Sequence, residues 1–225
     1  MPILNAADRG RFVAAILVCV GVAVATGRPV GAQPDVPSEL LPVDRILCPE
    51  IDECSGLVYH DGAFFTHNDS GDEPRLFRST TMNFEDPEQL PLDGATAVDW
   101  EELTVYENDL LICDIGDNRR ERNDLMLYRA RYEEGRLTLV ARYPIAYPDE
   151  PHDAEGVAVI DGHVYIITKA REDRVTNVYR FETLVAEEEN VPELVGRLDI
   201  GVGEQVTAAT YDASAGVLIL LTYSG

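Results

Sequence analysis

Hydrophobic residues along this chain occur in short runs that come in pairs, with turn-forming residues between the two runs. The clearest pair is Leu103–Tyr106 and Leu110–Cys113, joined by Glu107-Asn108-Asp109. This pattern predicts a β-hairpin, and nothing in the chain has the periodicity of a long amphipathic helix. Because the start of the first strand and the end of the second lie at the same end of a hairpin, the acids found at both places should come together.

Acidic side chains are therefore predicted to face each other at one end of this hairpin. With a two-residue turn at 107–108, Glu101 lies directly opposite Asp114. Glu102 lies beside this pair and Asp117 just beyond it. Like charges facing each other across two strands are unfavourable by a few tenths to about 1 kcal/mol, so the pair needs a cation, a proton or free access to water.

The same hairpin pattern recurs along the chain. Two copies align with it without a gap and carry the turn dipeptides Asp61-Gly62 and Asp161-Gly162, where both positions need a positive φ. A weaker fourth copy has a longer turn at Asp212–Gly216. A strand repeat of about 50 residues indicates a β-propeller with one four-stranded blade per repeat. The residues predicted to hold the same place in the four copies are Gly56, Glu102, Gly156 and Ala209.

A third-strand signature supports the repeat, since a hydrophobic residue, an aromatic residue and an arginine follow three of the hairpins: Leu76-Phe77-Arg78, Leu127-Tyr128-Arg129 and Val178-Tyr179-Arg180. We therefore predict an all-β fold, with a β-propeller domain over residues 43–225. About three and a half blades are expected in this stretch, whereas propellers close with typically 4–8. The chain is thus expected to be part of a six-bladed propeller. The alternatives are completion of the last blade by the N-terminal arm and assembly with another chain.

The N-terminal segment has the features of a secretory signal peptide, predicted at residues 1–32. Two arginines precede the apolar run Phe12–Ala25, which is too short to span a bilayer comfortably, and Val30-Gly31-Ala32 forms a small-residue cleavage site. Residues 33–42 are rich in proline and polar side chains and are predicted to be a linker. The mature protein is expected to be secreted or periplasmic, with no membrane segment. The alternative is an uncleaved N-terminal anchor.

The charge balance excludes one class of partner. The chain has 41 acidic and 18 basic residues, a formal net charge of −23, and a single lysine, Lys169. Phosphate binding needs clustered lysine and arginine, so a nucleic-acid partner is not expected. Strong acidity fits either solubility or divalent cations. Cys48 and Cys54 are close enough in sequence to pair in an oxidising compartment, which the spacing leaves open, and Cys113 is expected to be buried in a strand.

Oxygen-bearing side chains gather at the predicted mouth of the propeller channel, which the first strand of each blade lines. Calcium takes 6–8 oxygen ligands, so these side chains form a candidate calcium site. The alternative is that they are solvated loop acids in an acidic chain. His67 is a candidate general base of a hydrolase, although a lone histidine is more often a hydrogen-bonded structural residue. The predicted metal ligands are Asn68, Asp69, Glu101, Glu102, Asp114, Asp117 and Glu155.

Three groups of residues resemble a family of exported bacterial β-propellers of unsettled activity. They are Ser55-Gly56-Leu57 with His67–Asp72, Asp99–Glu102 with Asp114–Asn118, and Asp153–Gly156, within roughly residues 51–225. In fold, the chain is also similar to six-bladed calcium propellers such as gluconolactonases and the bacterial propeller phytases. That similarity implies calcium held by acids at the channel mouth and hydrolysis of lactones or phosphoesters.

Two functional hypotheses follow. The first is an exported, calcium-binding propeller that hydrolyses esters, lactones or phosphoesters at its acidic mouth, where calcium polarises the substrate oxygen. The second is a non-catalytic propeller in which the same acids hold a structural ion and a loop face binds a protein or small ligand. Similarity of fold does not choose between them.

Overall fold

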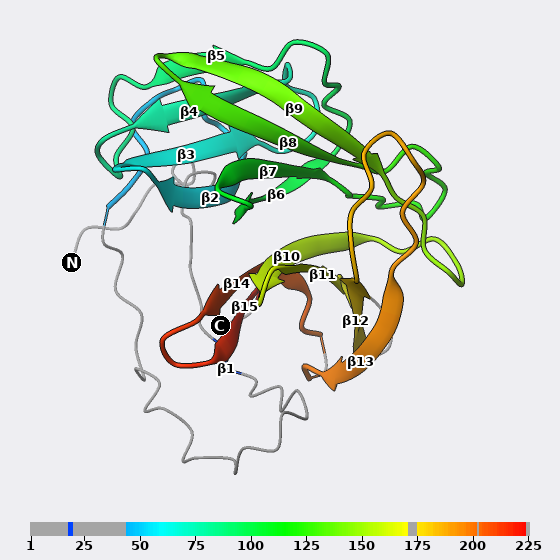
Figure 1. Cartoon of the computed structure of the whole chain (residues 1–225). Helices are drawn as coiled ribbons and strands as arrows, with labels where there is room; N and C mark the ends of the chain where they lie inside the picture. Colours follow the sequence, from blue (N-terminus) through cyan, green and yellow to red (C-terminus); the bar gives the residue numbers. More distant parts are fainter. Residues whose placement is uncertain (1–17, 20–43, 171–174, 202, 224–225) are drawn as a thin grey trace, which may run out of the picture.

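The computed structural model of the chain describes residues 18–19, 44–170, 175–201 and 203–223. All regular elements in these residues are β-strands, which form three four-stranded sheets and a fourth sheet of three strands. The sheets are the blades of a β-propeller (Figure 1), which confirms the predicted fold class. The described residues contain no helix with the length and hydrophobicity needed to span a membrane.

Each of the first three blades is an up-and-down sheet, in which strands adjacent in sequence are adjacent in space. The strands of blade 1 are β2 (Cys54–His60), β3 (Ala63–Asn68), β4 (Arg75–Ser79) and β5 (Glu88–Pro91), and those of blade 2 are β6 (Trp100–Tyr106), β7 (Asp109–Asp114), β8 (Met126–Glu133) and β9 (Arg136–Pro144). The strands of blade 3 are β10 (Ala154–Ile160), β11 (His163–Thr168), β12 (Val175–Phe181) and β13 (Glu193–Asp199). Blade 4 consists of β14 (Val206–Asp212), β15 (Val217–Thr222) and β1 (Val18–Cys19).

The first strand of each predicted repeat lies at the centre of the propeller. β6 contacts β2, β10 and β14 from the other three blades, and Figure 1 shows these inner strands between the upper and lower pairs of blades. Their starts lie at one end of the molecule, the mouth, where Ser55 Oγ donates to Glu101 O at 2.8 Å. The predicted convergence of the four repeats on a central axis is therefore present in the structure.

The predicted two-residue turns are confirmed by backbone conformation. Both residues of each turn have a positive φ, as a tight hairpin of this kind requires. The values are 46° and 77° for Asp61 and Gly62, 49° and 65° for Glu107 and Asn108, and 51° and 83° for Asp161 and Gly162.

The predicted register at the mouth is wrong by one residue. Trp100, rather than Glu101, pairs with Asp114, because a β-bulge between Trp100 and Glu102 leaves Glu101 as the extra residue. A bulge bends the strand and re-aims the side chain of the extra residue. Glu101 therefore does not face Asp114 across the two strands.

The same irregularity occurs near the start of every inner strand, between Cys54 and Leu57 in β2, between Ala154 and Gly156 in β10, and between Val206 and Ala208 in β14. In β14 it places Ala208, rather than the predicted Ala209, at the repeat position of Glu102. The bulge is thus part of the repeat, and it fixes which side chains point at the mouth.

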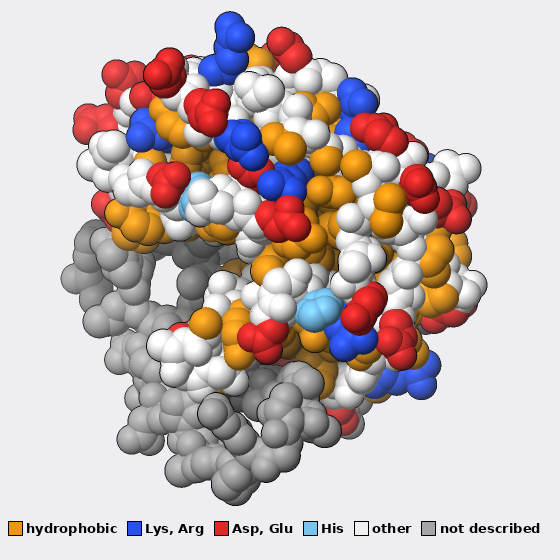
Figure 2. All heavy atoms as spheres, in the orientation of Figure 1, with side chains coloured by type: hydrophobic (Ala, Val, Ile, Leu, Met, Phe, Trp, Pro, Cys, Tyr) orange, Lys and Arg blue, Asp and Glu red, His pale blue; other side chains and the backbone are white. Residues whose placement is uncertain are grey.

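Hydrophobic clusters fill the space between neighbouring blades. Phe65 and Leu103 belong to the cluster between blades 1 and 2, Leu111 and Val157 to the cluster between blades 2 and 3, and Tyr165, Ala209 and Leu220 to the cluster between blades 3 and 4. Charged side chains are spread over the outer surface, with hydrophobic side chains between the upper and lower blades (Figure 2). Strands with hydrophobic residues on both faces are what a blade packed on two sides needs.

The segment before the first blade lies inside the predicted propeller domain but adds no strand to it. Residues 44–48 form no strand, and Ile46, Cys48 and Ile51 pack on Phe77 and Phe84. The predicted linker lies outside the described residues, as does the predicted signal peptide apart from Val18–Cys19, which pair with β15.

The cysteine pairing that the spacing left open is not formed, because Cys48 and Cys54 are both free. Cys48 Sγ donates to Glu50 Oε2 at 3.1 Å, and Cys54 Sγ lies 3.0 Å from Thr66 Oγ1. Each thiol has its own polar partner. Cys113 is completely buried, as predicted.

Candidate metal centre at the channel mouth

Three positions of the repeat place side chains at the mouth. The first directly precedes the inner strand, the second is the bulge residue within it, and the third directly follows the second strand. Backbone hydrogen bonds of 2.8 Å join the third position to the first, from Asp69 N to Glu53 O and from Lys169 N to Asp153 O. The residues are Glu53, Asp99, Asp153 and Gln205 at the first position, Ser55, Glu101, Glu155 and Thr207 at the second, and Asp69, Ile115, Lys169 and Tyr223 at the third.

Blades 1 and 2 bring three carboxylates together at the mouth. Asp69 follows β3, Asp99 precedes β6, and Glu101 is the bulge residue of β6. One carboxylate oxygen of each lies within 4.8 Å of the other two. Glu101 is 4% exposed and Asp99 9%, whereas Asp69 is more open to solvent. Three hard oxygen ligands in this arrangement, here named the acid triad, can hold a metal ion.

A glycine opposite the acid triad leaves room for it. A Cβ at Gly116 would overlap Glu101 Oε1 and Asp99 Oδ2, so no larger residue fits there without moving the carboxylates. Gly116 N also donates to Asp99 O at 3.2 Å. The backbone after β7 therefore forms one wall of the site.

The electrostatics of the acid triad disfavour three negative charges. Burial, together with the charge of Asp69, raises the pKa of Asp99 to about 6. Burial and the nearby carboxylates of Glu155, Asp69 and Asp99 raise the pKa of Glu101 well above its usual range. Without a bound cation, Glu101 therefore retains its proton at neutral pH, and a divalent cation would displace it.

The repeat explains why the acid triad forms between blades 1 and 2. At the equivalent place between blades 2 and 3, Ile115 takes the position of Asp69 beside Asp153 and Glu155, so one carboxylate is missing. In blade 3 the same position is Lys169, whose ammonium pairs with Glu155 and lies 3.3 Å from Tyr223 Oη. The third position carries an acid only in blade 1.

Glu155 is therefore a predicted ligand that already has a counterion. Lys169 is 7% exposed and Glu155 is also 7% exposed, so the ion pair is buried next to the acid triad. The charge of Lys169 lowers the pKa of Glu101, while that of Glu155 raises it.

Glu102 points away from the acid triad and joins blades through their backbones. Its carboxylate accepts the N–H of Ala209, in blade 4, and that of Leu103, both at 3.0 Å. Burial raises the pKa of Glu102 to about 8, although these hydrogen bonds oppose the shift. Its position at the centre of the propeller indicates a structural role.

Asp114 and Asp117, also predicted as ligands, hold the loop after β7. Asp114 accepts the N–H of Asp99 at 3.0 Å and Arg122 Nη1 at 2.8 Å. Asp117 accepts the N–H groups of Glu121 and Arg122, both at 2.9 Å. These bonds fix the loop that carries Gly116, so the two residues shape the site without belonging to the acid triad.

Asn68 and His67 lie below the mouth. Asn68 Nδ2 donates to Glu50 O at 2.8 Å and to Asp72 Oδ2 at 2.9 Å. His67 is completely buried, with its ring 5.5 Å from that of Trp100, and burial lowers its pKa. A substrate at the mouth has no access to His67 in this conformation, so its role as general base stays a prediction that its burial disfavours.

The triad thus contains two of the seven predicted ligands and adds Asp99, which the predicted set omitted. The signal for Asp99 was present in the repeat, because Asp153 occupies the same position directly before an inner strand. What the sequence did not supply was the bulge, which turns Glu101 away from Asp114 and brings it to Asp99 and Asp69.

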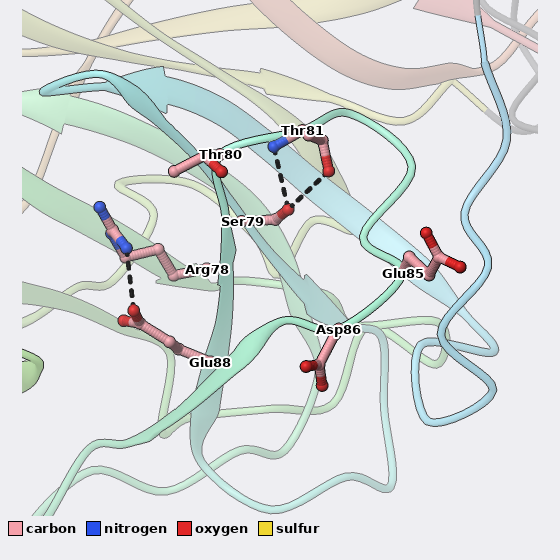
Figure 3. Close-up of a pocket in the computed structure, with 7 residues that line it drawn as sticks. All are labelled: Arg78, Ser79, Thr80, Thr81, Glu85, Asp86 and Glu88. Atoms are coloured by element: carbon pink, nitrogen blue, oxygen red, sulfur yellow. Dashed lines mark hydrogen bonds and ion pairs between the residues drawn. The ribbon is translucent and has the colours of Figure 1, made fainter.

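A pocket of about 310 Å³ lies elsewhere, at the outer edge of blade 1 (Figure 3). Its cation, Arg78, is neutralised by Glu88 at 3.1 Å, and Thr81 is bonded to Ser79. The pocket contains none of the predicted site residues, so we place the candidate site at the mouth. The lining residues are Arg78, Ser79, Thr80, Thr81, Glu85, Asp86 and Glu88.

Comparison with known proteins shows no match to a family model and none to a curated protein. Among solved structures, the chain is similar to the β-propeller domain of Cps50 (Swd1) from Myceliophteria thermophila, with 12% identity and a TM-score of 0.38 over 76% of this chain and 54% of that one. It is also similar to the computationally designed protein Ika8, with 11% identity and a TM-score of 0.35 over 76% of this chain and 59% of that one. The chain thus spans little more than half the length of either.

Proposed function

We propose that the protein is an exported β-propeller that binds a divalent cation, calcium, at the acid triad of Asp69, Asp99 and Glu101. The observation that carries this proposal is the convergence of one oxygen from each carboxylate within 4.8 Å. The atoms that the triad offers to a metal are hard carboxylate oxygens, with no thiolate or imidazole among them. Such ligands favour calcium, magnesium or manganese over zinc or copper.

The charge of the site supports a cation as its partner. Buried carboxylates with raised pKa values are held in place at a cost in stability, which a divalent ion would offset. No arginine or lysine bonds directly to these carboxylates among the hydrogen bonds of the described residues, whereas Asp114 has Arg122 and Glu155 has Lys169. Among the described residues, the triad therefore differs from Asp114 and Glu155 in having no directly bonded arginine or lysine.

Calcium is preferred over magnesium because of the irregular geometry of the site. Three carboxylates from a bulge, a pre-strand residue and a post-strand loop do not impose an octahedron, and calcium accepts variable geometry with 6–8 oxygens. The triad fills only part of that number. The remaining positions would hold water or a ligand on the solvent side, next to Asp69.

The test is a thermal melt of the full chain in EDTA and in calcium, magnesium or manganese. Calcium at 100 times its Kd should add about 2.7 kcal/mol of stability. For a domain of this size that corresponds to a rise in Tm of roughly 5–10 °C. Glu101→Gln should abolish the rise, while the exposed control Glu188→Gln should retain it. A cooperative melt that ignores all three ions would refute the proposal.

Hydrolysis of an ester, lactone or phosphoester is the second candidate function. The open positions on the ion favour it, because a substrate oxygen could bind there and be polarised. A screen of these three substrate classes with the calcium-loaded protein tests it. Turnover that requires calcium and is lost in Glu101→Gln but retained in Glu188→Gln would support catalysis at the ion. If calcium binds but none of these substrates is turned over, the ion has a structural role.

Export is tested separately from binding. Expression of the full chain with its N-terminus intact, followed by N-terminal sequencing of the protein recovered outside the cytoplasm, should give Gln33 as the first residue. Recovery of residues 1–32 on the exported protein would contradict signal cleavage and favour an anchor.

A further inference from the structure

Two glutamates from neighbouring inner strands lie close together at the mouth. Glu101 is the bulge residue of β6 and Glu155 is the bulge residue of β10, and these two strands contact each other. Burial and then the charge of Glu155 are the two largest causes of the raised pKa of Glu101. The carboxylate of Glu155 is therefore a fourth acid close enough to act on an ion in the acid triad.

Lys169 binds this fourth carboxylate. The residue directly follows β11, and its backbone N–H donates to Asp153 O at 2.8 Å, which fixes its position at the mouth. Its ammonium donates to Glu155 Oε1 and to Tyr223 Oη, the latter at 3.3 Å, and lies 5.1 Å from the centre of the Tyr223 ring. The ammonium thus holds the Glu155 carboxylate among groups of blades 3 and 4, whereas the acid triad comes from blades 1 and 2.

The ion pair between Lys169 and Glu155 is explained poorly by stability alone. A buried ion pair adds little net stability, because the desolvation of both charges offsets their attraction. Lysine carries a compact charge on a flexible stem, and Lys169 is the single lysine of the chain. Its charge acts on Glu101 in the opposite direction to the charge of Glu155. The clearest effect of the pair is therefore on the electrostatics of the acid triad.

We infer that Lys169 sets the calcium affinity of the acid triad by keeping the carboxylate of Glu155 from binding the ion. The inference rests on the proposed function, since it concerns the same ion. Calcium affinity depends on the number of charged ligands, and extracellular modules bind calcium with a Kd of about 10⁻⁴–10⁻³ M. With Glu155 bound to Lys169, three carboxylates remain for the ion, and we expect a Kd in that range. The triad is then filled only where calcium reaches about millimolar levels.

Calorimetric titration of the metal-free full chain with calcium tests the inference. The wild type should bind one ion at the acid triad. Lys169→Met removes the charge and keeps most of the side-chain length, and it should lower the Kd about tenfold with one ion still bound, because Glu155 becomes a fourth carboxylate ligand. Lys169→Arg keeps the charge and should retain the wild-type Kd. Arg131→Met is the matched control, because it removes a positive charge beside Asp109 at the far end of the hairpin β6–β7, and it should also leave the Kd unchanged.

Two further variants separate the effect of Glu155 from a general disturbance of the mouth. The double variant Lys169→Met/Glu155→Gln lacks the released carboxylate as well as the lysine, so its Kd should return to the wild-type value. Glu155→Gln alone leaves the ammonium of Lys169 unbalanced beside the acid triad and should raise the Kd about tenfold. Far-UV circular dichroism and a cooperative melt must show that each variant is folded. If Lys169→Met does not fold, Glu155→Gln decides the inference, and an unchanged Kd in that variant overturns it.

The titrations distinguish failure of this inference from failure of the proposed function. A wild type that binds no calcium refutes both together. A wild type that binds calcium with the same Kd as Lys169→Met overturns the role of Lys169 and leaves the acid triad as the ion site. A second ion in Lys169→Met, with the Kd of the first unchanged, also overturns the inference, because Glu155 would then belong to a separate site.

Discussion

The two ends of the hairpin β6–β7 hold buried acids in opposite states. At the turn end, Asp109 is 4% exposed and accepts hydrogen bonds from Arg129 Nε at 2.6 Å and Arg131 Nε at 2.8 Å. Although burial opposes it, these hydrogen bonds hold the pKa of Asp109 below its usual range. At the mouth, Asp99 is 9% exposed, and burial raises its pKa to about 6.

The exposed fractions of Asp109 and Asp99 are thus similar. The direction of each pKa shift follows from whether arginines bind the carboxylate. The arginines of the turn end come from β8, the strand beside β7, at positions fixed by strand pairing. The mouth ends of the same strands supply no arginine to the acid triad among the described residues. One end has its cation built into the chain, and the other leaves a place for a cation from solution.

Removing the acid at the turn end should have the largest effect on stability. Asp109→Asn leaves Arg129 and Arg131 without their shared partner, and breaking such a pair should cost about 3 kcal/mol. Urea denaturation of the full chain in EDTA measures this. Glu101→Gln at the mouth should leave stability equal or higher in the same buffer. Equal losses in both variants would mean that the two ends do not differ.

Closing the wall of the acid triad should have the next largest effect. Gly116→Ala forces a Cβ against Asp99 and Glu101 and should cost about 1–3 kcal/mol by overpacking. It should also abolish the calcium-dependent rise in Tm. Gly196→Ala is the matched control and should be nearly neutral, because its Cβ would lie 3.9 Å from its nearest neighbour, Val178 Cβ. A stable Gly116→Ala that still responds to calcium would place the ion elsewhere.

The pH dependence of stability should have opposite signs at the two ends. The raised pKa of Asp99 means that the folded state holds its proton more tightly, so stability in EDTA should fall by about 2 kcal/mol as the pH rises from about 4 through 6. The lowered pKa of Asp109 contributes stability above about pH 4, which is lost as the pH falls further.

Urea midpoints from pH 3 to 8, converted to free energies of unfolding, measure both limbs of this profile. Asp99→Asn should reduce the fall between about pH 4 and 6, to which the raised pKa values of Glu101 and Glu102 also contribute. Asp109→Asn should weaken the acid limb. A profile that is unchanged in Asp99→Asn would show that this carboxyl titrates normally, and the raised pKa would then have to be abandoned.

The smallest effect is expected at the arginine of blade 3 that corresponds to Arg129. Arg180 pairs with Glu182 at 2.9 Å and Glu193 at 3.4 Å, and both acids are more than two-thirds exposed. Arg180→Ala should therefore cost about 0.5 kcal/mol or less, compared with about 2 kcal/mol for Arg129→Ala. Thermal melts of both variants check this. A large loss in Arg180→Ala would show that the arginine supports the sheet by packing.

Local features of the chain were predictable to within a residue or two. The turn dipeptides Asp61-Gly62 and Asp161-Gly162 and the strand Arg75–Ser79 are found where the pattern places them. Positive φ at a turn and alternation along a strand depend on neighbours in sequence, which is why they were visible there. The free state of Cys48 and Cys54 depends on which polar atoms lie nearby in space. It could therefore not be predicted from the sequence.

The sequence by itself determined the repeat, the blades and the end of the molecule where acids gather, because strands of one hairpin must share their ends. Only the tertiary structure decided which acids meet. The bulge after Trp100 shifts the register at Glu101 by one residue, and Gly116 leaves space for the carboxylates. Lys169 pairs with Glu155 and Arg122 pairs with Asp114, two other predicted ligands. Those outcomes depend on distances between blades, which decide where carboxylates converge without a cation of their own and could hold a metal ion.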